Sequence, residues 1–259
     1  MKITVCQLDN RSTAREEVWS LLAAHVESAR PDLLVLPEMP FSDWLANDRP
    51  TPDAADRWAA AVAEQHRVLT EIEGWNAGAV LGTRPILRDG TSRRNEVFVA
   101  TDGQPARGIR EKYYLPDEAG YWEASWYDRG ALEFPQTRVA GASIGVQVCT
   151  ELWFFEWARR LGREGADIVA VPRATPRTST SKWLAGGRSA AVTSGAFCVS
   201  SNLGSPLDDA EGFGGCGWII DPEGNVLATT SEDDPFATVE IDLADARAAK
   251  STYPRYVAE

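Results

Sequence analysis

The chain has 259 residues, of which 44% are hydrophobic, and a formal net charge of −12 at pH 7. This length and apolar content suit one α/β domain with a sizeable core, so we expect a single domain over residues 1–259. The negative charge argues against a nucleic-acid partner, because phosphate binding needs a basic surface. No apolar run approaches the ~20 residues that span a bilayer, and the first residues do not resemble a signal peptide. We therefore expect a cytoplasmic protein with no membrane partner.

The cysteines and histidines exclude several kinds of site. The four cysteines show no C-x-x-C spacing, which disfavours a zinc site and a redox pair. We also expect no metal and no cofactor. Cys6 and Cys198 fall inside predicted strands as small buried hydrophobes, whereas Cys216 lies in a glycine-rich run and could line a pocket. His25 and His66 fall in predicted helices, which leaves little for Ser-His or Cys-His catalysis.

The first elements alternate strand and helix. Residues 3–8 alternate like a strand, and Thr-Ala-Arg-Glu at 13–16 matches a capping box that would open a helix. The wholly apolar run at 33–36, stopped by Pro37, predicts a buried strand covered on both faces.

A helix over 58–73 and a strand over 79–83 follow. Asp-Gly pairs at 89–90 and 102–103 predict hairpins on either side of a strand over 96–100.

The second half repeats the order of the first, with a strand over 142–148, a helix over 155–163 and a strand over 168–171. We interpret the chain as two similar βαβ-like halves packed together. The remaining predicted elements are a helix over 182–193, a strand over 197–201, a hairpin around 222–225 and a strand over 237–241.

Two reactive side chains follow buried strands. Glu38 comes after the run at 33–36, where an open α/β sheet places its binding crevice, although an isolated carboxylate there is more often a helix cap or a loop charge. Cys149 ends the strand over 142–148, directly before a predicted helix start. There the helix dipole would lower the pKa of the thiol, and backbone N–H groups would bind an oxyanion; the alternative is a small buried hydrophobe.

The segment 110–123 is rich in aromatic and acidic residues and carries Lys112 near the end of a strand. An isolated lysine there is most often solvated surface. The trio of Glu38, Lys112 and Cys149, in this order and with these neighbours, makes a stronger pattern.

This pattern resembles the nitrilase superfamily, also called the carbon-nitrogen hydrolases, whose members use a Glu-Lys-Cys triad in that order. The matching segments are Leu-Pro-Glu38, Glu-Lys112 and Val-Cys149-Thr-Glu-Leu-Trp-Phe, and the likeness extends to the hairpin at 217–225. The resemblance implies a four-layer αββα sandwich that forms a homodimer or a larger homo-oligomer. It also implies a thiol hydrolase of non-peptide carbon-nitrogen bonds, of the amidase or N-carbamoyl-amine hydrolase branch.

The segment after the lysine departs from many relatives, which carry Lys-x-His where this chain has Lys112-Tyr113-Tyr114. The resemblance implies a second active-site glutamate in this segment. Glu123 has the spacing of the carbamoylputrescine-hydrolase branch and is favoured, and Glu118 is the competitor that would otherwise contact the substrate.

The residue types themselves suit acyl transfer. The Cys149 thiolate would attack an amide or ureido carbonyl, while Glu38 accepts its proton and later activates water to release a thioester. Lys112 and the backbone N–H of Thr150 would stabilise the oxyanion, and Glu123 would position the substrate amide.

The sequence also suggests residues that bind the rest of the substrate. Arg173 and Arg177 follow a strand end, where a guanidinium can hold a carboxylate through two hydrogen bonds; the alternative is a solvated loop. Aromatic side chains that could form a wall of the site are Tyr114, Trp153, Tyr121 and Trp126.

Three other functions compete with a hydrolase of small amides or ureido compounds. A nitrilase would use the same triad on a small nitrile. A catalytically silent binding protein would keep only the fold, which the intact trio argues against. A glutaminase-like module that feeds ammonia to a partner is disfavoured, because 259 residues leave no room for a second domain.

Overall fold

The computed structural model describes residues 1–101, 104–209 and 212–258 and contains two β-sheets. The first sheet runs in the order β10 (Asn202–Leu203), β1 (Lys2–Leu8), β2 (Leu33–Val35), β3 (Ala79–Arg88), β4 (Ser92–Thr101) and β5 (Gln104–Glu111), and β13 (Phe236–Glu240) also pairs with β1. The second sheet runs in the order β12 (Val226–Thr229), β11 (Trp218–Ile220), β9 (Phe197–Ser200), β8 (Ile168–Ala170), β7 (Ala142–Val146) and β6 (Thr137–Val139). The helices are α1 (Arg15–Ala29), α2 (Ala54–Ile72), α3 (Glu123–Trp126), α4 (Phe155–Arg163), α5 (Thr180–Ser194) and α6 (Leu243–Ala249), with short 3-10 segments η1 (Leu45–Asn47), η2 (Cys149–Trp153) and η3 (Arg177–Ser179).

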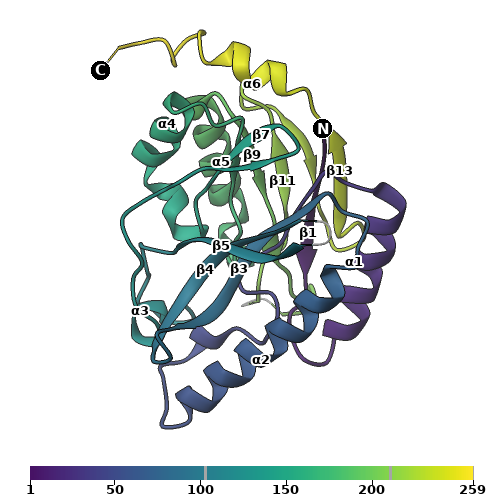
Figure 1. Ribbon diagram of the computed structural model, residues 1–259, viewed down its shortest axis with the longest axis vertical. Coiled ribbons are helices and arrows are strands. Elements are labelled where there is room, and N and C mark those ends of the chain that lie inside the picture. Colours follow the sequence, from purple (N-terminus) through teal and green to yellow (C-terminus); the bar gives the residue numbers. More distant parts are fainter. Residues whose placement is uncertain (102–103, 210–211, 259) are drawn as a thin grey trace.

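The two sheets pack face to face between two helical layers. Along β1, Ile3 and Val5 pack toward the second sheet, whereas Cys6 and Leu8 belong to the cluster under α1 and α2, as the two-residue period of a strand requires. Helices α4 and α5 cover the other face of the second sheet, on the opposite side of the molecule from α1 and α2 (Figure 1). The expected four-layer αββα sandwich is confirmed.

The parallel pairs explain the repeated pattern in the sequence. β1 and β2 are parallel and joined by α1, and β7 and β8 are parallel and joined by α4. The elements predicted from the sequence agree with the observed helices and strands to within a few residues, except that α2 starts earlier and β3 and β4 are longer. The Asp-Gly pair at 89–90 joins β3 to β4, and the pair at 102–103 lies outside the described residues.

The predicted capping box is wrong. Helix α1 begins at Arg15, and its N-cap, Ala14, makes no side-chain cap hydrogen bond. The backbone N–H groups of Ala14 and Arg15 both donate to the carbonyl of Arg11, which forms a turn and leaves Thr13 outside the capping position.

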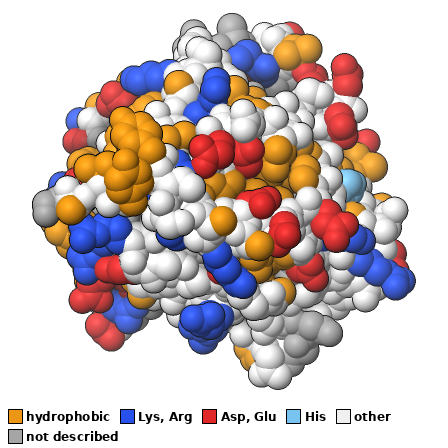
Figure 2. Space-filling view, turned by 90° about the horizontal axis from the view of Figure 1, so that it is seen from above, with side chains coloured by type: hydrophobic (Ala, Val, Ile, Leu, Met, Phe, Trp, Pro, Cys, Tyr) orange, Lys and Arg blue, Asp and Glu red, His pale blue; other side chains and the backbone are white. Residues whose placement is uncertain are grey.

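The surface carries mixed charge despite the net charge of −12. Figure 2 shows acidic, basic and hydrophobic side chains interspersed on the face seen from above. Within the described ranges, the helices are too short or too polar to cross a lipid bilayer.

Candidate active site

The ends of strands from both sheets meet at one place. Glu38 follows β2, Lys112 follows β5 and Cys149 follows β7. The backbone N–H of Glu38 donates to the carbonyl of Arg173 at 3.1 Å, and that of Cys149 donates to the carbonyl of Pro172 at 2.9 Å. The segment after β8 therefore holds the strand ends of the two sheets against each other.

Lys112 lies between two carboxylates. Its Nζ donates to Glu38 Oε1 at 2.8 Å and to Glu123 Oε2 at 2.6 Å, and all three side chains are buried. Burial disfavours the charged amine, but the negative charges of Glu123 and Glu38 outweigh it and raise the pKa of Lys112. The structure thus holds a fixed positive charge at the junction of the sheets.

Glu123, in the short helix α3, has an unusual titration range for a carboxylate. Burial raises its pKa to about 7, although the charge of Lys112 opposes this, and the charge of Glu38 raises it further. The hydroxyl of Tyr127 also donates to Glu123 Oε2 and so favours the ionised form. Glu123 therefore changes charge near neutral pH.

The carboxylates each keep one free acceptor. Glu38 Oε2 and Glu123 Oε1 are buried and have no hydrogen-bond partner within the described part of the chain. Asn95 donates to Glu38 Oε1 at 2.8 Å and fixes that side chain from behind. A buried acceptor without a partner is costly, so these two oxygens remain available to donors from water or from a ligand.

Cys149 sits on a sharp turn, with φ 47 in the left-handed region that a non-glycine residue rarely adopts. The expectation that a helix N-terminus lowers its pKa is wrong. The 3-10 segment η2 follows it, and α4 begins only at Phe155. Burial raises the pKa of the Cys149 thiol, and the charge of Glu38 adds to this more than Lys112 opposes it. The resting group is therefore a thiol, and its reaction needs a base.

A buried ion pair holds the strand ends around Lys112 and Cys149. Glu151 Oε1 accepts from Arg110 Nη2 and from the backbone N–H of Tyr113, each at 2.8 Å. Glu151 Oε2 accepts from Arg110 Nη1 at 2.6 Å and from the backbone N–H of Val148 at 2.7 Å. One carboxylate thus ties the residue after Lys112 to the residue before Cys149.

Cys149 opens into a cavity of about 360 Å³, a size that suits a small molecule. Of the residues expected from the sequence, Glu118, Tyr121, Thr150 and Trp153 line it with Cys149. Its other lining residues are Pro116, Ala174, Thr175, Pro176, Ser179, Lys182 and Trp183.

Other predicted substrate contacts lie elsewhere. Tyr114 stacks on Phe154, with ring centres 3.5 Å apart, and its hydroxyl accepts a hydrogen bond from the Trp157 indole. Trp126 is buried and donates to the carbonyl of Asp48. These two rings pack the protein outside the cavity that holds Cys149.

Arg173 is also placed differently from the expectation that it holds a substrate carboxylate. Its side chain is buried, and it donates to Ser200 Oγ at 2.7 Å, Thr175 Oγ1 at 2.8 Å and the carbonyl of Cys216 at 2.7 Å. Its guanidinium carbon lies 3.8 Å from the centre of the Trp218 ring. Burial lowers its pKa to about 10. Arg173 thus anchors protein groups beneath the site and does not line the cavity.

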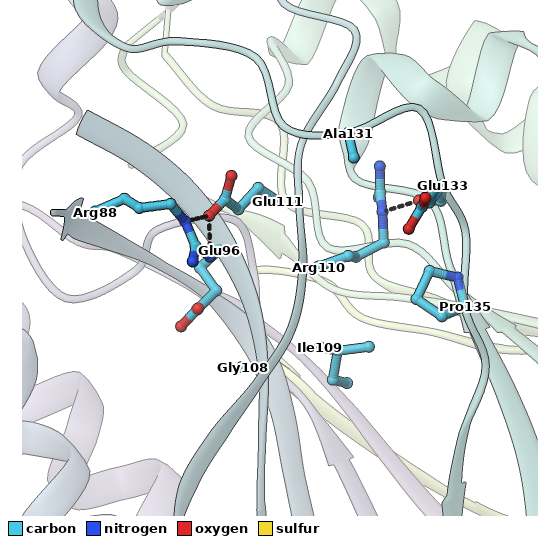
Figure 3. A pocket seen from close by; sticks show the side chains of 9 residues that line it. All are labelled: Arg88, Glu96, Gly108, Ile109, Arg110, Glu111, Ala131, Glu133 and Pro135. Atoms are coloured by element: carbon cyan, nitrogen blue, oxygen red, sulfur yellow. Dashed lines mark hydrogen bonds and ion pairs between the residues drawn. The ribbon is translucent and has the colours of Figure 1, made fainter. Parts of the chain in front are cut away.

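A second cavity, of about 300 Å³, lies beside β5 and residues 131–135 (Figure 3). Several of its charged side chains already pair with protein groups: Arg88 contacts Glu111, and Arg110 donates to the carbonyl of Glu133 at 2.8 Å. None of the residues that line this cavity is a cysteine, serine, threonine or lysine. Over the described ranges, His, Cys, Asp and Glu side chains form no group of three or more that could hold a metal ion.

The carbon-nitrogen hydrolase family matches residues 2–251. The chain belongs to the carbon-nitrogen hydrolase family. The resemblance seen in the sequence is thereby confirmed, and this carbon-nitrogen hydrolase acts on carbon-nitrogen bonds other than peptide bonds.

Curated relatives of this carbon-nitrogen hydrolase are named for several substrates. The chain is 27% identical over 236 residues to 2-oxoglutaramate amidase from Bacillus subtilis, covering 88% of this chain and 85% of the relative. It is 25% identical over 177 residues to citrullinase from Francisella tularensis, covering 67% of this chain and 61% of the relative. It is 28% identical over 223 residues to glutamine-dependent NAD(+) synthetase from Rhodobacter capsulatus, covering 83% of this chain but 38% of that relative.

Solved structures show the same fold. A carbon-nitrogen hydrolase from Helicobacter pylori has a TM-score of 0.80 and 21% identity, covering 99% of this chain and 94% of the other. An amidase from Nesterenkonia sp. AN1 has a TM-score of 0.79 and 21% identity, covering 96% of this chain and 97% of the other.

Proposed function

We propose that this carbon-nitrogen hydrolase is an amidase of small amides or ureido compounds that works through a Cys149 thioester and releases ammonia. The observation that carries the proposal is the placement of Lys112 between Glu38 and Glu123, at 2.8 and 2.6 Å, beside a cavity lined by Cys149. This arrangement supplies a base, a fixed positive charge and a nucleophile in one buried place.

The first step forms the thioester. Because the pKa of Cys149 is raised, the thiol needs a base, and the free Oε2 of Glu38 takes its proton as sulfur attacks the carbonyl carbon. Lys112 Nζ and the backbone N–H of Thr150 stabilise the oxyanion. Glu38 then returns the proton to the leaving nitrogen, the carbon-nitrogen bond breaks, and ammonia departs.

The second step consumes water. Glu38 removes a proton from a water molecule whose oxygen attacks the thioester carbon, and the carbon-sulfur bond breaks as the proton passes to Cys149. An amide substrate leaves as a carboxylic acid. A ureido substrate leaves as a carbamic acid, which decomposes to carbon dioxide and an amine.

Glu123 favours an amide or ureido nitrogen over a nitrile. Its unpartnered Oε1 is an acceptor, and a primary amide offers N–H donors to it, whereas a nitrile nitrogen offers none. The relatives named 2-oxoglutaramate amidase and citrullinase support an amide and a ureido substrate, respectively. We therefore assign Glu123, and not Glu118, to orienting the group that is cleaved.

Ammonia release tests this proposal. Wild type, Cys149→Ala and the matched control Cys216→Ala would be incubated with panels of small aliphatic amides, ureido acids and nitriles. We expect ammonia from amide or ureido compounds with wild type and Cys216→Ala, and none with Cys149→Ala. Turnover by Cys149→Ala at the wild-type rate would contradict the proposed nucleophile, and faster turnover of nitriles would contradict the proposed role of Glu123.

A further inference from the structure

One cation lines the cavity at Cys149 and is not used by the proposed mechanism. Lys182 lies in the first turn of α5, and its Nζ is 5.4 Å from the centre of the Trp153 ring, a cation-π contact with another lining residue. Within the described residues, no carboxylate oxygen lies close enough to Lys182 Nζ (4.0 Å) to form an ion pair. Glu118 is the other charged residue that lines the cavity. Its positive charge therefore remains available to a ligand.

The charges beneath the cavity are net negative, so an anionic ligand would need a cation nearby. Glu38, Glu123 and Lys112 together carry one excess negative charge when both carboxylates are ionised. That charge would repel an anionic ligand unless a cation on the wall compensates for it. The guanidinium of Arg173 is buried and already donates to three protein groups, so it does not supply this cation.

We infer that Lys182 binds a carboxylate at the far end of the substrate, so that the substrate is a small amide or ureido compound that also carries a carboxylate. The inference rests on the proposed function and names its substrate class. A cavity of about 360 Å³ holds a molecule of this size, with its amide carbon at Cys149 and its carboxylate at Lys182. The cation-π contact with Trp153 holds the Lys182 ammonium at the cavity wall in the absence of a ligand.

Glu118 sets the second part of the specificity. Its carboxylate lines the same cavity, so a substrate with an ammonium group beside its carboxylate gains a partner there. A substrate that carries only negative charge is repelled by it. Replacement of Glu118 by Gln should therefore favour anionic ligands.

Alkylation of Cys149 tests the cation without knowledge of the natural substrate. Iodoacetate and iodoacetamide have nearly the same size, and only the former is anionic, so the ratio of their rates cancels the intrinsic reactivity of the thiol. Intact mass and peptide mapping would follow the modification of Cys149 in wild type, Lys182→Met, Lys182→Arg and the distant control Lys2→Met.

We expect Lys182→Met to lower the ratio of the iodoacetate rate to the iodoacetamide rate about tenfold. Lys182→Arg and Lys2→Met should keep the wild-type ratio, and Glu118→Gln should raise it. A ratio in Lys182→Met equal to that of wild type would overturn the inference.

A steady-state arm separates this inference from the proposed function. Ammonia release would be compared for succinamic acid, which carries a carboxylate, and butyramide, which is similar in size and neutral. Lys182→Met should raise KM for succinamic acid about tenfold and leave KM for butyramide unchanged. Equal effects on both compounds would overturn the carboxylate site while leaving an amidase. If wild type released no ammonia from either compound while the alkylation ratio still depended on Lys182, the proposed amidase activity would be overturned and the anion site would stand.

Discussion

Glu151 offers a sharp test of how the site is held together. Replacement by Gln keeps the shape of the side chain but removes its charge and converts one carboxylate oxygen to an amide nitrogen. Oε1 accepts from Arg110 and the backbone N–H of Tyr113, and Oε2 accepts from Arg110 and the backbone N–H of Val148. Whichever oxygen is replaced, the new N–H₂ group faces two donors.

The cost follows from burial. The side chains of Arg110 and Glu151 are 4% and 0% exposed, so water cannot replace the lost partner. Breaking such a pair leaves an uncompensated buried charge and typically costs about 3–5 kcal/mol. A typical domain has a free energy of unfolding of about 5–15 kcal/mol, so Glu151→Gln should lose a large share of its stability.

Urea denaturation, followed by tryptophan fluorescence, would measure the change. The matched control is Glu164→Gln, because Glu164 pairs with Arg160 at 2.8 Å on an exposed helix face, where such a pair contributes only about 0.3–0.5 kcal/mol. We expect a large fall in the urea midpoint for Glu151→Gln and almost none for Glu164→Gln. A loss below about 1 kcal/mol for Glu151→Gln would refute this account of the buried pair.

Two further predictions concern pH and packing. The Tyr127 hydroxyl favours the ionised form of Glu123, so Tyr127→Phe should raise the pKa of Glu123 above about 7. The acid limb of the kcat/KM profile should then move to higher pH by about one unit. An unchanged acid limb would contradict the role of Glu123 as a carboxylate. A Cβ at Gly162 would lie 2.1 Å from the backbone oxygen of Ser194, so Gly162→Ala should lower the free energy of unfolding by about 1–3 kcal/mol. Gly74→Ala, whose nearest such contact is 3.4 Å, is its control, and equal urea midpoints for the two variants would show that α4 and α5 adapt freely.

The sequence predicted the strands and helices from short local patterns, whereas the four layers were expected from the resemblance to a known family. The apolar runs before Glu38 and Cys149 mark buried strands, and each side chain was expected at the carboxyl end of its strand, where an α/β sheet places its binding crevice. Glu38 and Cys149 follow strands of two different sheets, so their meeting depends on how the sheets pack. Glu123 was favoured over Glu118 by a spacing shared with one family branch; in the structure Glu123 contacts Lys112 and Glu118 lines the cavity, and the role of each stays a prediction.

The support of the site could not be predicted in the same way. The contacts of Glu151 with Tyr113, and of Asn95 with Glu38, join residues far apart in the sequence, and no local pattern reports which of them pair. The direction of the Cys149 pKa shift depends on burial by the whole fold and on the charge of Glu38, which come from parts of the chain far from residue 149.

The substrate contacts were the hardest to predict. Arg173 follows a strand end, as a binding residue would, but its guanidinium points to protein acceptors, while Lys182 from the next helix reaches the cavity. Association into a homodimer or larger assembly stays a prediction.

The acyl-enzyme would identify the nucleophile. Wild type, Cys149→Ala and Cys216→Ala would be mixed with succinamic acid or butyramide, quenched in acid during turnover, and measured by intact-protein mass with peptide mapping. We expect an added acyl group, with loss of ammonia, on Cys149 in wild type and Cys216→Ala and no adduct in Cys149→Ala. An acyl group on another residue, or turnover by Cys149→Ala, would contradict the proposed nucleophile.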